Sequence, residues 1–487
     1  MLSYRKLAMR VLGRPLHTGR IDSPRPASQR AAAFILTAAM LITLAAPAFA
    51  GTWCIDEGNI TVKAGDTKGK NTVSQGNKKD VEDTNTIITG TSDKNTVTID
   101  TSKGNVDVTF DDLNIDASSR KEAAMSVTGS GNTTIKLDGD NHLTGGNGSS
   151  GIDSIGSLTI YGGENDSLTA KGGSGADGSG GDGIHSGSLT IYGGTVNANG
   201  GNCGDGNYSD GGSGIRISSH SLTIYDGTVN AKGGNGGDGN YSDGGSGISS
   251  NGSLAISGGT VTAKGGSGED GSGGRGIIST KSVTISGGTV EANGGNGNSG
   301  GGSGIYSSVI DLSGSLELTA KAGSPNGKAL SQKGSELVLD TIKDKLGPGA
   351  KVTATDADGK VIDQVSTPRP VEPEESSSSS DGGSAAPSAP ASPLPGLTVT
   401  DKDGQRISYT STQSGNTLTV CVGRFTASFR ISLAALRQLR AEGIETIAFQ
   451  TVLCSTTLSV DELLAMGGEN AEAVLTHRFT DSSLTVG

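Results

Sequence analysis

Six glycine-rich segments follow one another through the centre of this chain, and their regular repetition limits the folds that it can adopt. Each segment opens on a Gly-Ile pair, and successive pairs lie 32, 31, 33, 29 and 28 residues apart. The pairs begin at Gly151, Gly183, Gly214, Gly247, Gly276 and Gly304. A repeat of this length indicates a supersecondary unit that is stable only when it stacks on its neighbours. We therefore expect a solenoid.

Three short apolar stretches within each segment show the two-residue alternation of β-strands. In the stretch SLTIYGG, Leu189 and Ile191 face one way, while Thr190 and Tyr192 face the other. Strands this short can bury an apolar face only by stacking, so equivalent residues should form interior columns. The first column holds Ile152, Ile184, Ile215, Ile248, Ile277 and Ile305; the second holds Leu158, Leu189, Leu222, Leu254, Val283 and Ile310; the third holds Ala170, Ala198, Ala231, Ala263, Ala292 and Ala320. This pattern predicts an all-β fold, a parallel β-helix.

The composition is compatible with a folded protein only because of this repeat. Aromatic residues make up 3% of the chain and 81 residues are glycine, which without order would indicate low complexity or disorder. Identical aliphatic side chains stacked about 4.8 Å apart can fill a narrow interior without large rings. Residues 183–201 suffice for one three-sided coil, and the remaining glycine loop leaves from the same corner in every unit.

Weaker forms of the pattern extend the solenoid in both directions. Upstream strands are expected at 97–99, 106–110, 113–115 and 135–137, and downstream strands at 337–339 and 352–355 before a turn at 356–359. The downstream strands should cap the coil, because an open end would pair with other chains. The chain then divides into a signal peptide at 1–50, an N-terminal segment or cap at 51–84, the β-helix at 85–365, a Pro/Ser-rich linker at 366–396 and a C-terminal domain at 397–487.

The first 50 residues have the order of a secretory signal peptide. A basic stretch precedes an apolar run from Ala31 to Leu44, and Ala48-Phe49-Ala50 supplies an A-x-A cleavage site. Cleavage after Ala50 predicts a secreted or extracellular protein, associated with the cell surface in one version of the hypothesis, with no membrane span left in the mature chain. A retained signal anchor is the alternative.

The mature chain is strongly acidic. Removal of residues 1–50 takes away seven basic side chains and one acidic side chain, which leaves 31 Lys+Arg against 49 Asp+Glu and a net charge of −18. This balance argues against nucleic acid or an anionic membrane as the main partner. Glycans and divalent cations remain compatible with it.

Beyond the linker, whose seven prolines predict a semi-extended chain, the composition is that of an ordinary small α+β domain. Strands are expected at 407–410, 417–422, 425–431 and 444–452, and helices at 432–443 and 459–466. Four cysteines, Cys54, Cys203, Cys421 and Cys454, allow three full pairings that the sequence cannot rank. Export makes a bridge between Cys421 and Cys454 a reasonable candidate.

Three groups of motifs resemble a known family. They are VDVTFDDLNID at 106–116, TTIKLDGDNHLTG at 133–145 and the recurring GI…SLTIYGGTVNA units. The stretch from about residue 85 to 365 that contains them resembles bacterial extracellular proteins described as carbohydrate-binding-domain-containing. The resemblance implies a right-handed parallel β-helix and suggests carbohydrate binding.

Five tyrosines are the candidate ligand-binding residues. Tyr161, Tyr192 and Tyr225 occupy the same outward position on adjacent coils, and Tyr208 and Tyr241 lie in two GNYSDGGS loops that could flank them. Tyrosine offers an apolar face and a polar tip, so a row of exposed rings could stack against sugars. Because the coils lie about 4.8 Å apart, the rings could instead stack on one another.

The glycine loops suggest calcium as a cofactor. Asp177, Asp238 and Asp270 each end a stretch that matches the first six positions of a calcium-binding nonapeptide, G-G-x-G-x-D-x-U-x, and Asp205 ends GGNCGD, which matches except at Cys203. A carboxylate with loop carbonyls suits a hard cation. The apolar U position is not met and the motifs are not in tandem, so a solvated flexible loop is the alternative.

Polysaccharide lyases and hydrolases also use β-helices, and their chemistry requires two or three carboxylates on one face. Two rows of outward strand positions are Thr159, Thr190, Thr223, Ala255 and Thr284, and Thr169, Asn197, Asn230, Thr262, Glu291 and Thr319, in which Glu291 is the lone acid. We therefore favour a non-enzymatic surface protein that binds glycan, or acts as an adhesin, through one face of its repeats. The alternatives are a structural stalk that presents the C-terminal domain to another cell-surface protein, and a polysaccharide-degrading enzyme.

Overall fold

The computed structural model describes the chain from residue 51 to 486 with gaps. The described residues are 51–67, 69–176, 178–204, 206, 209–238, 241–368, 396–400, 406–407, 409–422, 426–451, 454–466, 471–478 and 481–486. The expected signal peptide and most of the expected linker lie outside them. Among the described residues, no helix is both long enough and apolar enough to cross a membrane.

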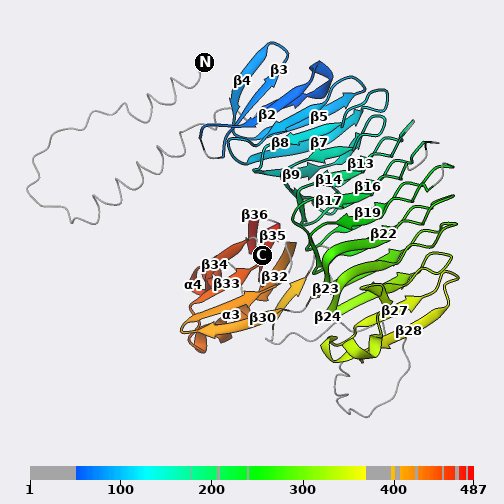
Figure 1. The fold of residues 1–487 in the computed structure, drawn as a ribbon. Coiled ribbons are helices and arrows are strands. Elements are labelled where there is room, and N and C mark those ends of the chain that lie inside the picture. The colour runs from blue at the N-terminus through cyan, green and yellow to red at the C-terminus, as the bar shows by residue number, and fades with distance from the viewer. Residues whose placement is uncertain are drawn as a thin grey trace, which may run out of the picture. The chain divides into compact units, whose positions relative to one another are not determined.

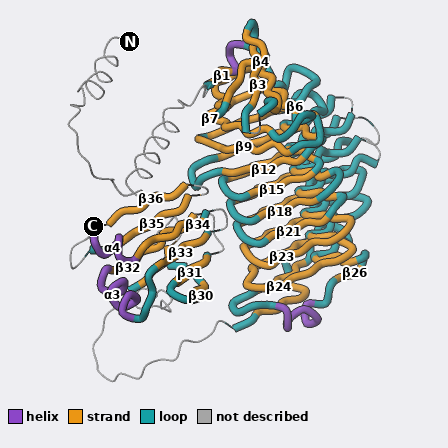
Figure 2. The backbone as a smooth tube through the Cα atoms, turned by 90° about the vertical axis from the view of Figure 1, so that its left-hand side faces the viewer, coloured by secondary structure: helices purple, strands orange, loops and turns teal. Residues whose placement is uncertain are grey.

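Residues 52–366 form one winding sheet system, a β-solenoid (Figures 1 and 2). Its strands pair in parallel with equivalent strands of neighbouring coils and form three ladders, named A, B and C in chain order within a coil. In Figure 2 the strands β9, β12, β15, β18 and β21 of ladder B lie as successive rungs. The fold is therefore an all-β solenoid, as the repeat predicts.

Each ladder takes one short strand from each coil. Ladder A contains β2 (Ile60–Ala64), β6 (Val97–Asp100), β8 (Met125–Thr128), β11 (Ile152–Ser154), β14 (Ile184–Ser186), β17 (Ile215–Ile217), β20 (Ile248–Ser250) and β25 (Leu330–Gln332). Ladder B contains β1 (Thr52–Cys54), β5 (Thr86–Ser92), β7 (Val106–Asp116), β9 (Asn132–Asp138), β12 (Ser157–Tyr161), β15 (Ser188–Ile191), β18 (Ser221–Ile224) and β21 (Ser253–Ile256). Ladder C contains β10 (Asp140–Thr144), β13 (Ser167–Lys171), β16 (Thr195–Asn199), β19 (Thr228–Lys232), β22 (Thr260–Lys264) and β27 (Lys351–Thr355), while β23 (Ile277–Asn293) and β24 (Ile305–Lys321) pass through all three ladders.

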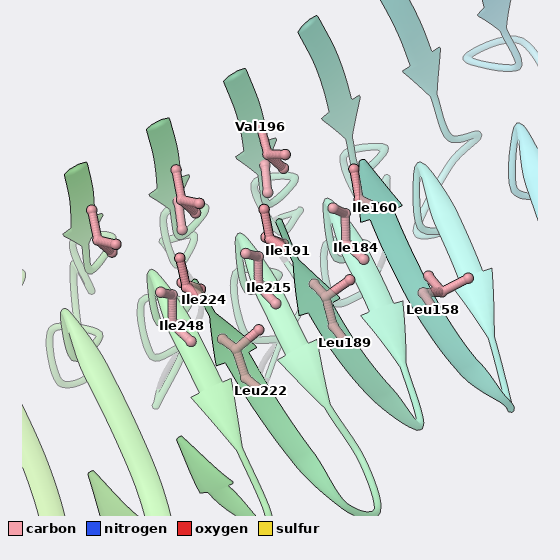
Figure 3. Close-up of a cluster of buried hydrophobic side chains, with 14 of the residues drawn as sticks. Leu158, Ile160, Ile184, Leu189, Ile191, Val196, Ile215, Leu222, Ile224 and Ile248 are labelled. Carbon is pink, nitrogen blue, oxygen red and sulfur yellow. The ribbon is translucent and has the colours of Figure 1, made fainter. Parts of the chain in front are cut away.

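The three predicted columns are confirmed residue by residue. Ile184 pairs with Ile152 and Ile215, Leu189 pairs with Leu158 and Leu222, and the alanine column has the same register throughout. Every member of the three columns is at most 5% exposed. Figure 3 shows members of the first two columns, among them Ile184, Ile215, Leu189 and Leu222, pointing into the space that the ladders enclose. The solenoid interior is thus a continuous stack of aliphatic groups.

Antiparallel strands cover both ends of the solenoid. At the first end, β3 (Asn71–Gln75) pairs with β2, and β4 (Lys78–Asp83) pairs with β3, after the short helix η1 (Ile55–Glu57). At the other end, β28 (Val361–Ser366) pairs with β27. The strand predicted at 337–339 is wrong: β26 (Ser335–Glu336) pairs back on β25, and the helix η2 (Leu339–Lys345) follows. Of the three apolar residues at 337–339, Leu339 opens η2 and is buried, whereas Val338 is 58% exposed.

The glycine loops are ordered close to the coil. Each loop has an outgoing arm that follows a ladder C strand and an incoming arm that precedes a ladder A strand. A continuous series of backbone N–H···O bonds of 2.8–2.9 Å crosses between the two sets of arms. It runs from Gly323 through Gly302, Gly295, Gly274, Gly266, Gly245, Gly234, Gly212, Gly201, Gly181 and Gly173 to Ser149. The bases of these loops, which we call the glycine arms, are therefore not the solvated flexible loops of the alternative hypothesis.

Glycine is required in the arms because backbone fills the space where a side chain would project. A Cβ added to Gly234 would lie 1.9 Å from the Gly201 carbonyl oxygen, and one added to Gly212 would lie 1.9 Å from that of Gly181. Exposure in the outgoing arms recurs every three residues, as in Gly233-Gly234-Asn235, where Asn235 is the exposed member. A three-residue period is that of a polyproline-II chain, which bonds to neighbouring chains and not to itself.

The C-terminal region has two four-stranded sheets and a core of its own. The first sheet contains β29 (Leu397–Thr400), β32 (Thr426–Ser432), β35 (Glu472–Arg478) and β36 (Asp481–Val486), and the second contains β30 (Thr410–Ser414), β31 (Thr417–Cys421), β33 (Thr446–Gln450) and β34 (Ser455–Ser459). The helices are α3 (Leu433–Ala441) and α4 (Val460–Met466).

Sequence signals located the C-terminal helices better than the strands. Ser432 caps α3 by accepting a hydrogen bond from the Ala435 N–H, and Gly443 follows the helix with a φ of 90°, as its terminator should. The strand predicted at 407–410 is wrong, because β30 begins at Thr410. Strands β29, β34, β35 and β36 were not predicted.

Candidate functional site

The outward side of ladder C is a regular array of polar groups. We call this side, together with the exposed residues of the outgoing arms, the polar face. Inward and outward positions alternate along each strand, so that Val196 and Ala198 are buried while their neighbours reach the surface. The rows across successive coils are Ser167, Thr195, Thr228, Thr260 and Thr289; Thr169, Asn197, Asn230, Thr262 and Glu291; Lys171, Asn199, Lys232, Lys264, Asn293 and Lys321; and Ser174, Asn202, Asn235, Ser267 and Asn296. Each row repeats at the coil spacing of about 4.8 Å.

Side-chain amides connect adjacent coils along this face. Asn230 Nδ2 donates to Asn197 Oδ1 at 2.9 Å, and Asn197 Nδ2 donates to Thr169 Oγ1 at 3.3 Å. In the outer row, the Asn235 N–H donates to Asn202 Oδ1 at 2.9 Å. An amide has two N–H donors and two acceptor lone pairs, so these bonds use half of the capacity of Asn197 and leave the rest for solvent or a ligand. The face is therefore held in register and still able to form hydrogen bonds.

Lysines give one row of the polar face a positive charge on an otherwise acidic chain. Lys264 Nζ lies 3.7 Å from Glu291 Oε1. Within the described residues, Lys171, Lys232 and Lys321 form no ion pair. The row thus offers ammonium donors beside the hydroxyl and amide rows.

The candidate tyrosines form a stacked column and not an open platform. The rings of Tyr161 and Tyr192 have centroids 4.7 Å apart and an interplanar angle of 9°, and those of Tyr192 and Tyr225 are 4.9 Å apart at 1°. Burial, followed by the neighbouring Tyr192, raises the pKa of Tyr161 to about 12. The rings use their faces on one another, so the alternative of mutual stacking is the one observed. Tyr241 is exposed on its loop, and Tyr208 lies outside the described residues.

The structure does not gather the calcium candidates that it describes. Asp238 and Asp270 are exposed at loop tips, whereas Asp177 and Asp205 lie outside the described residues. Glu269, which was not a candidate, hydrogen-bonds to Asp238, and this bond and the charge of Asp238 raise the pKa of Glu269. In the part of the chain that the structure describes, no group of three or more His, Cys, Asp or Glu side chains could hold a metal ion.

The candidate disulfide is not formed. Strand β33 lies between β31, which ends at Cys421, and β34, which begins just after Cys454. Two strand spacings, roughly 9.6 Å, exceed the Cα separation of about 7 Å that a disulfide allows. Cys421 is a free thiol, with its Sγ 3.3 Å from Gln450 Oε1.

Two groups of charged residues were missed by the sequence analysis. On ladder A, His185 Nδ1 lies 2.8 Å from Asp153 Oδ1, and Arg216 Nε donates to Asp182 Oδ2 at 2.7 Å. Asp153, His185 and Arg216 occupy equivalent outward positions on ladder A, and Asp182 precedes β14, but the sequence gives no indication that these side chains pair. At the corner between ladders B and C, burial and the nearby Asp111, Asp166 and Asp112 raise the pKa of Asp138.

A hollow of about 410 Å³ lies at the far end of the solenoid and not on the polar face. Its lining includes Val309, Leu337 and Ile342, with the Asp311–Lys345 ion pair of 2.9 Å at its edge. Polar and charged side chains, Asp311, Gln332, Thr341 and Lys345, make up half of its lining residues.

Comparison with known protein families, with curated proteins and with solved structures finds no match to this chain. The class that the geometry itself defines is a β-solenoid protein with one repeated, hydrogen-bonding face.

Proposed function

We propose that this is a secreted or cell-surface protein of non-enzymatic function, whose solenoid binds an extended glycan through the polar face. The observation that carries the proposal is the amide and hydroxyl row of Thr169, Asn197 and Asn230, held in register by its own hydrogen bonds. A polysaccharide presents hydroxyl groups at regular intervals and can form one or more hydrogen bonds with each coil. Many weak contacts of about 1 kcal/mol each would add along the chain.

Features outside the polar face support a secreted glycan-binding protein. The family resemblance of the central repeats suggests carbohydrate binding and a right-handed coil, residues 1–50 would direct export, and residues 366–396 would link the solenoid to a separate α+β domain at 397–487. An enzyme would require converging carboxylates, and Glu291 remains the lone acid in the rows of the polar face within ladder C strands β13 to β23.

A double substitution on the polar face tests the proposal. Asn197→Ala with Asn230→Ala removes two amides, and we expect binding to a retained glycan to weaken about tenfold, since 1.4 kcal/mol corresponds to one decade. Retention on insoluble cellulose, chitin and xylan and on an array of soluble glycans would identify the ligand. The matched control is Thr190→Ala with Thr223→Ala, which alters equivalent outward positions on ladder B. If both double variants bound the glycan equally well, the polar face of ladder C would not be the binding surface.

The stalk hypothesis rests on a different observation, which is that the C-terminal region has a hydrophobic core separate from that of the solenoid. If this region carries the partner site, glycan or cell binding should be retained by a fragment of residues 396–487 and be absent from residues 51–368. Binding confined to residues 51–368 would favour the polar face.

A further inference from the structure

Three side chains on two adjacent coils form a charged cluster within the polar face. Lys264 ends β22, and Glu291 and Asn293 lie near the end of β23. Lys264 is the direct register partner of Asn293, and Thr262 is that of Glu291. Glu291 Oε1 accepts a hydrogen bond from Asn293 Nδ2 at 2.5 Å and lies 3.7 Å from Lys264 Nζ. One carboxylate oxygen therefore holds an amine and a carboxamide side by side.

This arrangement contains the reactants and the proton carrier of an amide-forming reaction. We propose that Lys264 and Asn293 join through an intramolecular isopeptide bond, with Glu291 as the carrier of protons. The bond would connect two neighbouring coils covalently on the outside of ladder C. It would close a loop of chain between residues 264 and 293 without any oxidant, metal or added cofactor.

The reaction balances within the three side chains. The Lys264 ammonium gives a proton to the Glu291 carboxylate, and the resulting neutral amine attacks Cγ of Asn293. The Nζ–Cγ bond forms as the Cγ–Nδ2 bond breaks. Nδ2 receives one proton from the attacking nitrogen and one from Glu291, and it leaves as an ammonium ion. The products are one secondary amide and one ammonium ion, and Glu291 ends as the carboxylate that it was at the start.

The rate of this reaction depends on how far solvent reaches Lys264 and Glu291. The side chains of Lys264 and Glu291 are 52% and 47% exposed, so water competes for both charges. The reacting species is the neutral amine, so we expect the bond to form faster as the pH rises. The competing attack on Asn293 by its own backbone is hindered, because the Gly294 N–H donates to the Lys321 carbonyl at 2.9 Å.

The chain contains its own control. Asn199 also lies between two register-paired lysines, Lys171 and Lys232, but the residue two positions before it is Asn197, where Glu291 stands in the later coil. An amine and a carboxamide are thus adjacent at Asn199 without a carboxylate to move the proton. We expect a cross-link at Asn293 and none at Asn199.

Peptide mass spectrometry of the purified chain tests the proposal after incubation at neutral and at alkaline pH. We expect a branched tryptic peptide that joins Lys264 to Asn293, lighter by one ammonia, and more of it at alkaline pH. Tandem spectra distinguish this peptide from an Asn293 succinimide, which loses the same mass without joining two peptides. Glu291→Gln and Lys264→Arg should abolish the branched peptide while circular dichroism shows the fold unchanged. Absence of the branched peptide from the parent protein at alkaline pH, or its equal formation by Glu291→Gln, would overturn the proposal.

Discussion

The strands and the glycine arms of one coil fill their interiors in opposite ways. Between the ladders, aliphatic side chains stack in columns, and the residue at one position can be Leu254, Val283 or Ile310 in successive coils. Between the arms, no side chain intervenes, and backbone N–H groups reach carbonyl oxygens at 2.8–2.9 Å. A column tolerates changes of shape, because neighbouring side chains can repack. Where two arms meet, as at Gly234 and Gly212, there is no room even for a methyl group.

This difference explains the composition of the chain. A hydrophobic column contributes through apolar area removed from water, so it needs few residues per coil. The arms contribute through directional backbone bonds, each worth about 1 kcal/mol, and they need glycine wherever two arms meet. The many glycines of the chain are therefore a structural requirement in the arms and not a sign of disorder.

The largest test of this comparison replaces a glycine at the centre of the arms. Gly234→Ala places a Cβ 1.9 Å from the Gly201 carbonyl oxygen, so two arms must separate and lose hydrogen bonds on both sides. We expect the free energy of unfolding to fall by on the order of 4 kcal/mol, combining overpacking with lost hydrogen bonds. Chemical denaturation monitored by circular dichroism measures it.

Gly300→Ala is the matched control, because a Cβ there has nothing within 4 Å. We expect a change smaller than about 0.5 kcal/mol for this variant. If Gly234→Ala were as stable as Gly300→Ala, the arms would not be the close-packed lattice described above.

A smaller effect of opposite sign is expected in a column. Thr133 is fully buried between its register partners Val106 and Leu158, and its Oγ1 has no hydrogen-bond partner. Thr133→Val removes an unsatisfied hydroxyl without changing shape, so stability should rise by about 1 kcal/mol. Thermal unfolding compares it with Thr223→Val on the outward side of ladder B, which should change little. If Thr133→Val lowered stability, the columns would tolerate substitutions less well than we expect.

The smallest expected effect is a pH dependence of the free energy of unfolding, which arises from His185 next to the arms and from His477 in the C-terminal region. The hydrogen bond and charge of Asp153 raise the pKa of His185, so its protonated form is favoured by folding. The stabilisation is complete below the unfolded value of about 6.5 and is lost as pH rises through the raised pKa. Burial lowers the pKa of His477 in the C-terminal region, so its contribution is present above about 6.5 and lost as pH falls.

Histidine titration by NMR measures both groups in one sample. The two C–H resonances should titrate on opposite sides of the ordinary value, and Asp153→Asn should bring His185 back toward it while leaving His477 unchanged. Titration of both histidines on the same side would refute the contrast between these environments.

Prediction from sequence was complete for the repeated columns and mixed for segments that occur once, where capping residues located α3 but the strand at 337–339 was misplaced. The Ile, Leu and Ala columns were predicted in full, because one register error would have moved every member to the outside. The segment at 337–339 has no second copy to fix its register, and of its three apolar residues only Leu339 lies in η2. At the site, the row positions of Tyr161, Tyr192 and Tyr225 were correct, but only their ring geometry shows that the faces are used by one another.

The sequence by itself determined the solenoid, its period and which aliphatic side chains lie inside, since these follow from alternation and repetition along the chain. Tertiary structure decided how the glycine arms bond to each other and which side chains meet across coils. Lys264 and Glu291 are 27 positions apart in the numbering, and their approach depends on the path of the loop between them. Side-chain identity does not show which backbone groups bond to each other. The hydrogen bonds between the glycine arms are therefore known only from the three-dimensional structure.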